Sequence, residues 1–241
     1  MGKIKIIKVL TPVIFSIIIT AENIIPFKVG ETLNYTASFK GIKAAKGELA
    51  VLGKEYLDDT DAYHVRFSAR TIGITDYIFP INDTVDIWLS SDSLLTIKVL
   101  SNIKEGRHSR TEKSFFNHNK KVVISGSDTL SFNGSVHSPY SLFYYFRNKD
   151  FSFLQNDSIS TFQGGKFSSL ELSIEKNIEA SVEAGNFICT RITPRLLNKG
   201  KFKNDSEMSI SFSNDKSRYP VKIKLKMRYG SLILNLDNVI N

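Results

Sequence analysis

The sequence predicts an all-β protein, mainly antiparallel, in which a large curved sheet or incomplete β-barrel carries one short helix on its concave side. Most of the chain consists of short runs of alternating apolar and polar residues, a pattern that indicates strands with one buried face. Turn phrases such as "SGSD" and "QGGK" separate these runs, and one segment with a helical start signal breaks the alternation. Such one-sided alternation favours antiparallel sheets, because parallel sheets are buried on both faces.

The first alternating run, "ETLNYTASFKG", places Leu33, Tyr35, Ala37 and Phe39 on one face and ends at Gly41. Further runs follow at spacings typical of an all-β domain: 63–70, 85–89, 94–103, 109–117, 120–125, 170–174, 186–193, 207–213 and 221–229. No linker-like stretch, fixed-period repeat or low-complexity tract divides the sequence. Residues 22–241 are therefore expected to form a single antiparallel β domain.

The last of these runs, from Val221 to Tyr229, separates charge by face. Apolar residues take the odd positions, and the even positions form a basic row about 20 Å long, made of Lys222, Lys224, Lys226 and Arg228. We interpret the row as the solvated face of a strand that is guarded against edge pairing. The alternative is a basic surface that faces an anionic membrane or an envelope protein.

The segment "HSPYSLFYYFRNKD" predicts the helix over residues 138–148. Ser138 is a candidate N-cap and Pro139 suits the first helical position. Its apolar residues go nearly all round, which favours a helix buried against the concave side of the sheet. Spacings of three and four residues place four candidate ligand-binding residues on one face, namely Tyr140, Phe143, Tyr144 and Arg147.

The N-terminus has the plan of a secretory signal peptide over residues 1–21. Three lysines precede an apolar run from Val9 to Ile19, and Thr20 and Ala21 follow it. An uncleaved N-terminal anchor is the alternative, although the apolar run is short for a membrane span. Removing this segment would lower the formal net charge from +8 to +5, because it contains three lysines and no acid. We expect an exported, periplasmic protein without a lipidation cysteine.

The sequence contains none of the common local catalytic or cofactor-binding motifs. Phosphate-binding loops, dinucleotide fingerprints, nucleophile elbows and clustered zinc ligands are absent, so we expect no catalytic residue, cofactor or metal. Nucleic acid is not an expected partner, because the aromatic residues of the basic strand alternate onto the opposite face. The only cysteine, Cys189, lies in a strand-like run and is expected to be buried and inert.

Two groups of residues leave a dispersed catalytic site open. His108 and His118 lie in a segment with Glu105 and Glu112, which could supply carboxylates if the fold brought them together. Acids also cluster as Asp83, Asp86 and Asp92, but the first two have opposite parity and should point to opposite faces. His64 falls on the polar parity of its strand and is expected to be solvated, whereas His137 flanks the helix start.

Several phrases resemble the bacterial exported "domain of unknown function 3108" family. They are "FKVGETLNYTASFKGIKAAKGELAV", "KEGRHSRTEKSFF", "SPYSLFYYFRN", "AGNFICTRITPRL" and "GKFKNDSEMSISFSNDKSRYPVKIKLKMRYGSL", in this order along the chain. The resemblance implies a periplasmic, largely antiparallel β protein and brings no agreed activity. The leading expectation is non-enzymatic binding of an apolar or amphiphilic, lipid-like molecule in the curved sheet. The alternatives are a protein-interaction or assembly factor of the envelope, and a hydrolase with a dispersed site.

Overall fold

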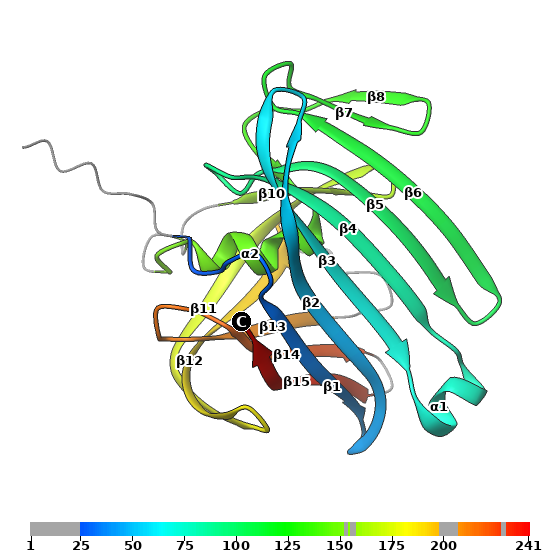
Figure 1. Ribbon diagram of the computed structural model, residues 1–241, viewed down its shortest axis with the longest axis vertical. Coiled ribbons are helices and arrows are strands. Elements are labelled where there is room, and N and C mark those ends of the chain that lie inside the picture. Colours follow the sequence, from blue (N-terminus) through cyan, green and yellow to red (C-terminus); the bar gives the residue numbers. More distant parts are fainter. Residues whose placement is uncertain (1–24, 152–153, 155–157, 198–206, 228–229) are drawn as a thin grey trace, which may run out of the picture.

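The computed structural model describes residues 25–151, 154, 158–197, 207–227 and 230–241 (Figure 1). Fifteen strands within these ranges join in one sheet, and short helices connect some of them. In chain order the elements are β1 (Thr32–Phe39), β2 (Ile42–Leu57), β3 (Thr60–Thr71), α1 (Gly73–Ile78), β4 (Asn82–Ser90), β5 (Thr96–Glu105), β6 (His108–Asn117), β7 (Val122–Ser125), β8 (Asp128–Ser131), β9 (Val136–His137), η1 (Pro139–Ser141), α2 (Leu142–Arg147), β10 (Ile159–Gln163), β11 (Lys166–Val182), β12 (Gly185–Leu196), β13 (Glu207–Ser213), β14 (Pro220–Met227) and β15 (Gly230–Ile240).

The sheet is antiparallel apart from the short pairing of β9 with β10, and it curls until its two edges approach each other. Its order runs from β8 back through β1, continues with β15, and then runs back to β9. The edge strands β8 and β9 are separated in the chain only by residues 132–135. A link of that length spans at most roughly 18 Å, so the opposite edges of the sheet must lie close together. This geometry confirms the predicted curved sheet and incomplete barrel.

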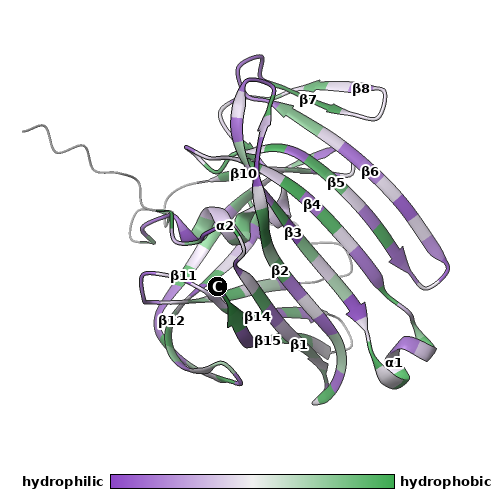
Figure 2. Cartoon of the chain, in the orientation of Figure 1, coloured by the Kyte–Doolittle hydropathy of each residue, from purple (hydrophilic) through white to green (hydrophobic). Residues whose placement is uncertain are grey.

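The alternation seen in the sequence decides which side chains enter the barrel. In β4, Val85, Ile87 and Leu89 are completely buried in the main core. Figure 2 shows the corresponding bands of hydrophobic and hydrophilic residues along β3 to β6. Because side chains of a strand alternate between faces, the sequence pattern transfers directly into an apolar interior and a polar exterior.

The helical segment lies inside the curve of the sheet, as predicted. The Ser138 hydroxyl accepts a hydrogen bond from the Tyr140 amide at 3.3 Å, and Pro139 is the first residue of η1. The α2 side chains share one core with strands from both halves of the sheet. Phe146, for example, packs edge-on against Phe212 of β13, with ring centroids 6.0 Å apart. The helix therefore fills part of the concavity and ties the two halves together.

Side-chain packing joins the barrel where the two sheet edges meet. A separate apolar cluster gathers side chains from β6 to β10 and the link before β9, namely Phe116, Val123, Phe132, Val136 and Phe162. The rings of Phe116 and Phe162 lie 5.9 Å apart and almost perpendicular. We call this junction the seam. No described strand pairing crosses it, so the seam is held by apolar contacts.

Several elements lacked a clear period-two signal in the sequence. The alternating runs do not include β2, β8, β9, β10, β15 or the helix α1. Strand β2 contains Gly47 and Gly53, and its pairing with β3 shifts register between Val51 and Gly53. Such a bulge moves the following side chains to the other face and breaks the alternation. The last predicted run is β14, which ends at Met227, while Arg228 and Tyr229 lie outside the described residues.

Candidate functional site

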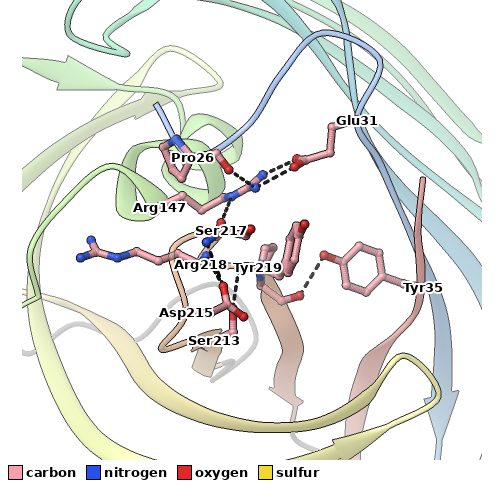
Figure 3. Close-up of polar contacts among 10 residues, drawn as sticks. Pro26, Glu31, Tyr35, Arg147, Ser213, Asp215, Ser217, Arg218 and Tyr219 are labelled. Atoms are coloured by element: carbon pink, nitrogen blue, oxygen red, sulfur yellow. Dashed lines mark hydrogen bonds and ion pairs between the residues drawn. The ribbon is translucent and has the colours of Figure 1, made fainter. Parts of the chain in front are cut away.

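Arg147 ends the helix and forms a buried ion pair with Glu31, which precedes β1 (Figure 3). Its two terminal nitrogens donate to the two carboxylate oxygens of Glu31 at 2.6 and 2.9 Å. The same guanidinium donates to the carbonyls of Pro26 at 2.8 Å and Ser217 at 3.0 Å. Both charged side chains are at most 3% exposed. Arg147 therefore connects α2 to the N-terminal segment and to the loop between β13 and β14.

Aromatic rings surround this ion pair and exclude water from it. The guanidinium carbon of Arg147 lies 5.4 Å from the ring centroids of Phe27 and Tyr219 and 5.9 Å from that of Tyr144. Burial raises the pKa of Tyr144, whose hydroxyl has no partner among the described residues. Burial likewise raises the pKa of Tyr35, whose hydroxyl donates to the Pro220 carbonyl. These neutral phenols suit a dry, closely packed interior.

The four residues predicted to bind a ligand are divided by the structure. Phe143, Tyr144 and Arg147 are buried in the packed interior, whereas Tyr140 faces the seam. Its ring lies 5.7 Å from that of Phe67, and its hydroxyl receives a hydrogen bond of 3.5 Å from the Gln163 amide. The three buried residues therefore serve packing and ion pairing, and Tyr140 adjoins a described pocket.

That pocket adjoins a larger cleft, with which it shares two lining residues. The inner part is only about 20 Å³ and is lined by Val99, Ser101, Glu112, Ser114, Phe116, Ser138, Tyr140, Phe162, Gln163 and Gly164. The outer part is about 460 Å³ and is lined by Thr111, Glu112, Lys113, Phe115, Ile124, Ser125, Gly126, Gly164 and Gly165. Because the two parts share Glu112 and Gly164, we treat them as one site and call it the seam cleft.

The seam cleft exists because β7 is much shorter than its neighbour β6. Strand β7 pairs only with residues 114–117, so along 108–113 no described strand covers the outer edge of β6. The opposite wall is the turn between β10 and β11, where Gly164 and Gly165 adopt positive φ angles of 56° and 75°. Glycine adopts this left-handed backbone readily, which allows the tight turn beside the opening.

The walls of the seam cleft combine an apolar pair with charged residues. Phe115 and Ile124 lie opposite each other on β6 and β7, and Ile124 is 44% exposed. The Lys113 ammonium lies 4.7 Å from the centroid of the Phe115 ring, and Glu112 pairs with Arg110 at 3.5 Å. One signal in the sequence pointed here: Phe115 and Phe116 are adjacent, so one of the two rings must leave the core.

The two histidines of the predicted dispersed site lie at opposite ends of β6, and no described hydrogen bond or ion pair joins either of them to a carboxylate. His108 is exposed opposite Glu105 at the turn between β5 and β6. His118 bonds through Nε2 to the Thr96 carbonyl at 2.8 Å, and burial lowers its pKa. Burial lowers the pKa of His137 to about 3, so this imidazole stays neutral. Within the described ranges, no three His, Cys, Asp or Glu side chains are grouped to hold a metal ion.

Asp83 and Asp86 point to opposite faces of β4, as their parity predicted. Asp83 faces inward and accepts a hydrogen bond from the Lys104 amide at 2.8 Å, and burial raises its pKa. Asp86 faces outward and accepts from Arg66 at 2.8 Å. Asp92 lies in the following turn, where it accepts from the Ser93 hydroxyl at 3.0 Å. These acids therefore do not combine into a carboxylate pair.

The expectation of a solvated His64 is wrong. Its Nδ1 lies 2.9 Å from Glu55 and its Nε2 lies 2.8 Å from Asp86, while its ring stacks on Trp88 with centroids 4.3 Å apart. The Trp88 indole donates to Glu55 at 2.8 Å, and the Lys98 ammonium lies 3.8 Å from the ring centroid. Polar parity in the sequence located this outward-facing cluster, but it could not show that the side chains bury one another.

The basic strand lies in the middle of one half of the sheet. Strand β14 pairs with β13 and β15, so its lysines do not guard an edge. Val221 and Ile223 are buried, whereas Lys222 is half-buried and Lys224 and Lys226 are exposed. Lys226 lies 3.8 Å from Glu207, and both side chains are solvated. The row is therefore the wet face of an interior strand over the described residues, and Arg228 lies outside them.

Cys189 is buried with Ala180 and Val221 in a small apolar cluster. Burial raises the pKa of its thiol to about 11, which keeps it protonated at neutral pH. Because the thiolate is the reactive form, the expected inert thiol agrees with this environment.

Comparisons with known proteins agree on the fold and carry no activity. A crystal structure of a β-barrel-like protein of the domain of unknown function DUF1849 from Brucella abortus resembles the structure with a TM-score of 0.54. The two chains share 10% sequence identity, and the match covers 88% of this chain and 97% of the other. No curated protein matches the sequence. None of the described helices is long and apolar enough to cross a membrane.

The family assignment rests on a match that extends across most of the sheet. The model of the family described as "Protein of unknown function (DUF3108)" matches residues 34–237. This range begins in β1 and ends in β15, so it includes the seam cleft and the helix α2. The chain therefore belongs to the DUF3108 family of proteins of unknown function.

Proposed function

We propose that this protein is a non-enzymatic binding protein of the cell envelope, which holds an apolar or amphiphilic, lipid-like molecule in the seam cleft. The observation that carries the proposal is an open cleft of about 460 Å³ with mixed apolar and charged walls. This volume falls within the range of roughly 300–1,000 Å³ that is usual for small-molecule sites. The envelope location is supported by the signal-peptide plan of residues 1–21, which lie outside the described residues.

The cleft walls suit the two ends of an amphiphile. An apolar chain would cover the Phe115 and Ile124 side chains, which otherwise face water. A polar head group would lie near Glu112 and Lys113, which can form charge-assisted hydrogen bonds. Non-enzymatic binding is favoured over a hydrolase at the two predicted histidines, because no described hydrogen bond or ion pair joins His108 or His118 to a carboxylate.

The first experiment is native mass spectrometry of protein purified from the periplasm without detergent, followed by organic extraction. We expect a stoichiometric amphiphile that is lost from the double variant Phe115→Ser/Ile124→Ser. The matched control is Phe187→Ser/Ile188→Ser, which removes a similarly exposed pair from β12. An apo mass that added envelope lipids leave unchanged would overturn the proposal. Equal retention of the lipid by both variants would show that the lipid binds outside the seam cleft.

A second candidate function is protein interaction at the free edge of β6. Residues 108–113 present one backbone edge that no described strand covers, and an extended partner segment could pair with it. A photo-cross-linking residue at Thr111 should then capture an envelope protein in cells, whereas one at the exposed Asn186 should not. Failure to cross-link at Thr111 would remove this candidate.

A further inference from the structure

We propose that one rim of the barrel docks on an anionic membrane surface through exposed apolar side chains on and just after α1. These side chains, which we call the apolar rim, are Ile74, Tyr77, Ile78 and Phe79, with exposed fractions of 70%, 91%, 72% and 49%. No residue of α1 is buried. A helix that contributes nothing to the core and keeps large apolar side chains in water indicates a surface made for contact. This inference does not depend on a ligand in the seam cleft.

Polar contacts hold the backbone of this segment in place while most of its apolar side chains stay exposed. The Thr71 hydroxyl donates to Asp76 at 2.6 Å and accepts from the Ile81 amide at 2.8 Å. The Gly106 amide donates to the Pro80 carbonyl at 2.7 Å, which joins the segment to the turn between β5 and β6. The ring of Phe79 lies against Gly106, whereas Ile74, Tyr77 and Ile78 stay largely exposed, so the fold fixes the apolar rim without burying it.

Positive charge surrounds the apolar rim. The exposed basic residues on the neighbouring strand ends and turns are Lys43, Arg70, Lys104 and Arg107. Backbone contacts place them beside the segment: the Ile72 amide donates to Ala44, next to Lys43, at 3.0 Å, and the Gly106 amide, next to Arg107, donates to Pro80 at 2.7 Å. Ile81 also forms a β-bridge with Glu105, next to Lys104. The acids in the same region are Asp76 and Glu105. Cations outnumber acids in this region, so its charge complements an anionic surface.

The shape of this region favours a bilayer over a pocket-forming partner. Figure 1 shows α1 at an outer corner of the sheet, at the end of β3 and away from α2. The apolar side chains are exposed at this corner, and Ile42 at the start of β2 is also 65% exposed. Apolar and aromatic side chains beside cations are typical of segments that lie in the membrane interface. We therefore assign the anionic bilayer surface as the occupant.

The test measures sedimentation with vesicles of phosphatidylglycerol and phosphatidylcholine in equal amounts, using the full chain as the cell processes it. We expect Ile74→Ser/Tyr77→Ser/Ile78→Ser to weaken binding about tenfold or more. The control is Leu52→Ser/Tyr56→Ser, which removes exposed apolar side chains near the opposite end of β2. Wild-type affinity in the control variant and unchanged urea unfolding in both variants would locate the loss in the apolar rim.

Two further measurements test insertion and charge. In Tyr77→Trp the added fluorescence should shift to shorter wavelength with these vesicles, whereas in Tyr56→Trp it should not. Lys43→Gln/Arg70→Gln/Arg107→Gln should weaken binding by about fivefold for each cation at low salt. Absence of wild-type binding, unchanged binding of the apolar-rim variant, or equal binding to pure phosphatidylcholine would overturn the proposal.

Discussion

Arg147 and Glu31 make the most deeply buried ion pair among the described residues, and they join segments far apart in the sequence. The guanidinium also holds two backbone carbonyls and contacts three aromatic rings. Its charge is therefore satisfied only when α2, the segment before β1 and the loop before β14 are all in place. Removing one partner of such a buried pair lowers the free energy of unfolding strongly, because the remaining charge stays buried without a partner.

We therefore expect Arg147→Met to lower the free energy of unfolding by about 3–5 kcal/mol, measured by urea unfolding. The double variant Glu31→Met/Arg147→Met should recover part of this loss, because no uncompensated charge remains. The control pair is Arg191 and Glu175, which lie 3.0 Å apart in partly solvated positions and should couple by under about 1 kcal/mol. A loss below about 1 kcal/mol in Arg147→Met would contradict this assignment.

His137 should make the protein less stable in mild acid. Burial lowers its pKa from 6.5 to about 3, so the unfolded chain binds a proton at a pH where the folded protein does not. The stabilising contribution is complete above about pH 6.5, falls as the pH drops, and is lost near about pH 3. The slope reaches at most about 1.4 kcal/mol per pH unit.

The measurement compares urea unfolding at several pH values for the wild type and His137→Gln. Subtracting the two curves removes the carboxylate titrations that both proteins share. His108→Gln is the control, because His108 is exposed at a turn. A wild-type curve parallel to that of His137→Gln between about pH 6.5 and pH 3 would show that the buried imidazole is not the cause.

Among the elements, β14 and α1 differ in whether burial of other side chains accounts for the exposed ones. Strand β14 alternates, so burial of Val221 and Ile223 accounts for the lysines on its other face. The α1 segment buries nothing, so burial does not account for its apolar side chains. The fold therefore accounts for the cationic strand, whereas within the described residues it leaves the apolar side chains of α1 uncovered.

Replacing Lys222, Lys224 and Lys226 by Gln should change the free energy of unfolding by no more than about 0.5 kcal/mol for each site. The reason is that Lys224 and Lys226 are exposed, Lys222 is only half-buried, and the apolar face of β14 is retained. Urea unfolding checks this expectation. The same variant should still bind anionic vesicles if the apolar rim is the docking surface. Loss of vesicle binding here, with normal folding, would instead identify the basic strand as the membrane-facing surface.

At the scale of the whole molecule, strands from the two ends of the described chain meet inside the sheet. Strand β15 pairs with β1 on one side and β14 on the other, and Thr32 lies opposite Ile240. The two runs of neighbouring strands, β1 to β8 and β9 to β14, are joined in the sheet through β15. Such pairing between distant segments makes folding slow, because the chain loses the entropy of closing a long loop before the stabilising contacts between its ends can form.

Deleting residues 230–241 should therefore abolish cooperative unfolding of the whole chain. Without β15, both β1 and β14 would lose a hydrogen-bonded neighbour in the interior of the sheet. Circular dichroism during urea unfolding checks this expectation. As a control, deleting the Asp128–Ser131 strand β8, which lies at the sheet edge and buries little, should preserve a sharp transition. Cooperative unfolding of the 230–241 deletion would show that the two groups of strands fold without this junction.

Much of the fold could be predicted because alternation is a local property of the sequence. The runs that became β1, β3, β4 and β13 were visible, as was the capped helix after Ser138. Strand β2 was hidden by its bulge, and β15 by an apolar run without clear alternation. The seam cleft was also hidden, since it depends on β7 being short where the turn at Gly164 approaches.

The sequence by itself determined the all-β class, the buried face of each clear strand and the position of the helix, because each follows from residues near one another in the chain. Tertiary structure decided which charged and aromatic residues serve packing and which meet solvent. It paired Arg147 with Glu31, turned Tyr140 toward the seam and left the apolar rim uncovered. These outcomes depend on contacts between distant segments, and a local sequence pattern does not determine which distant segment packs against a given residue.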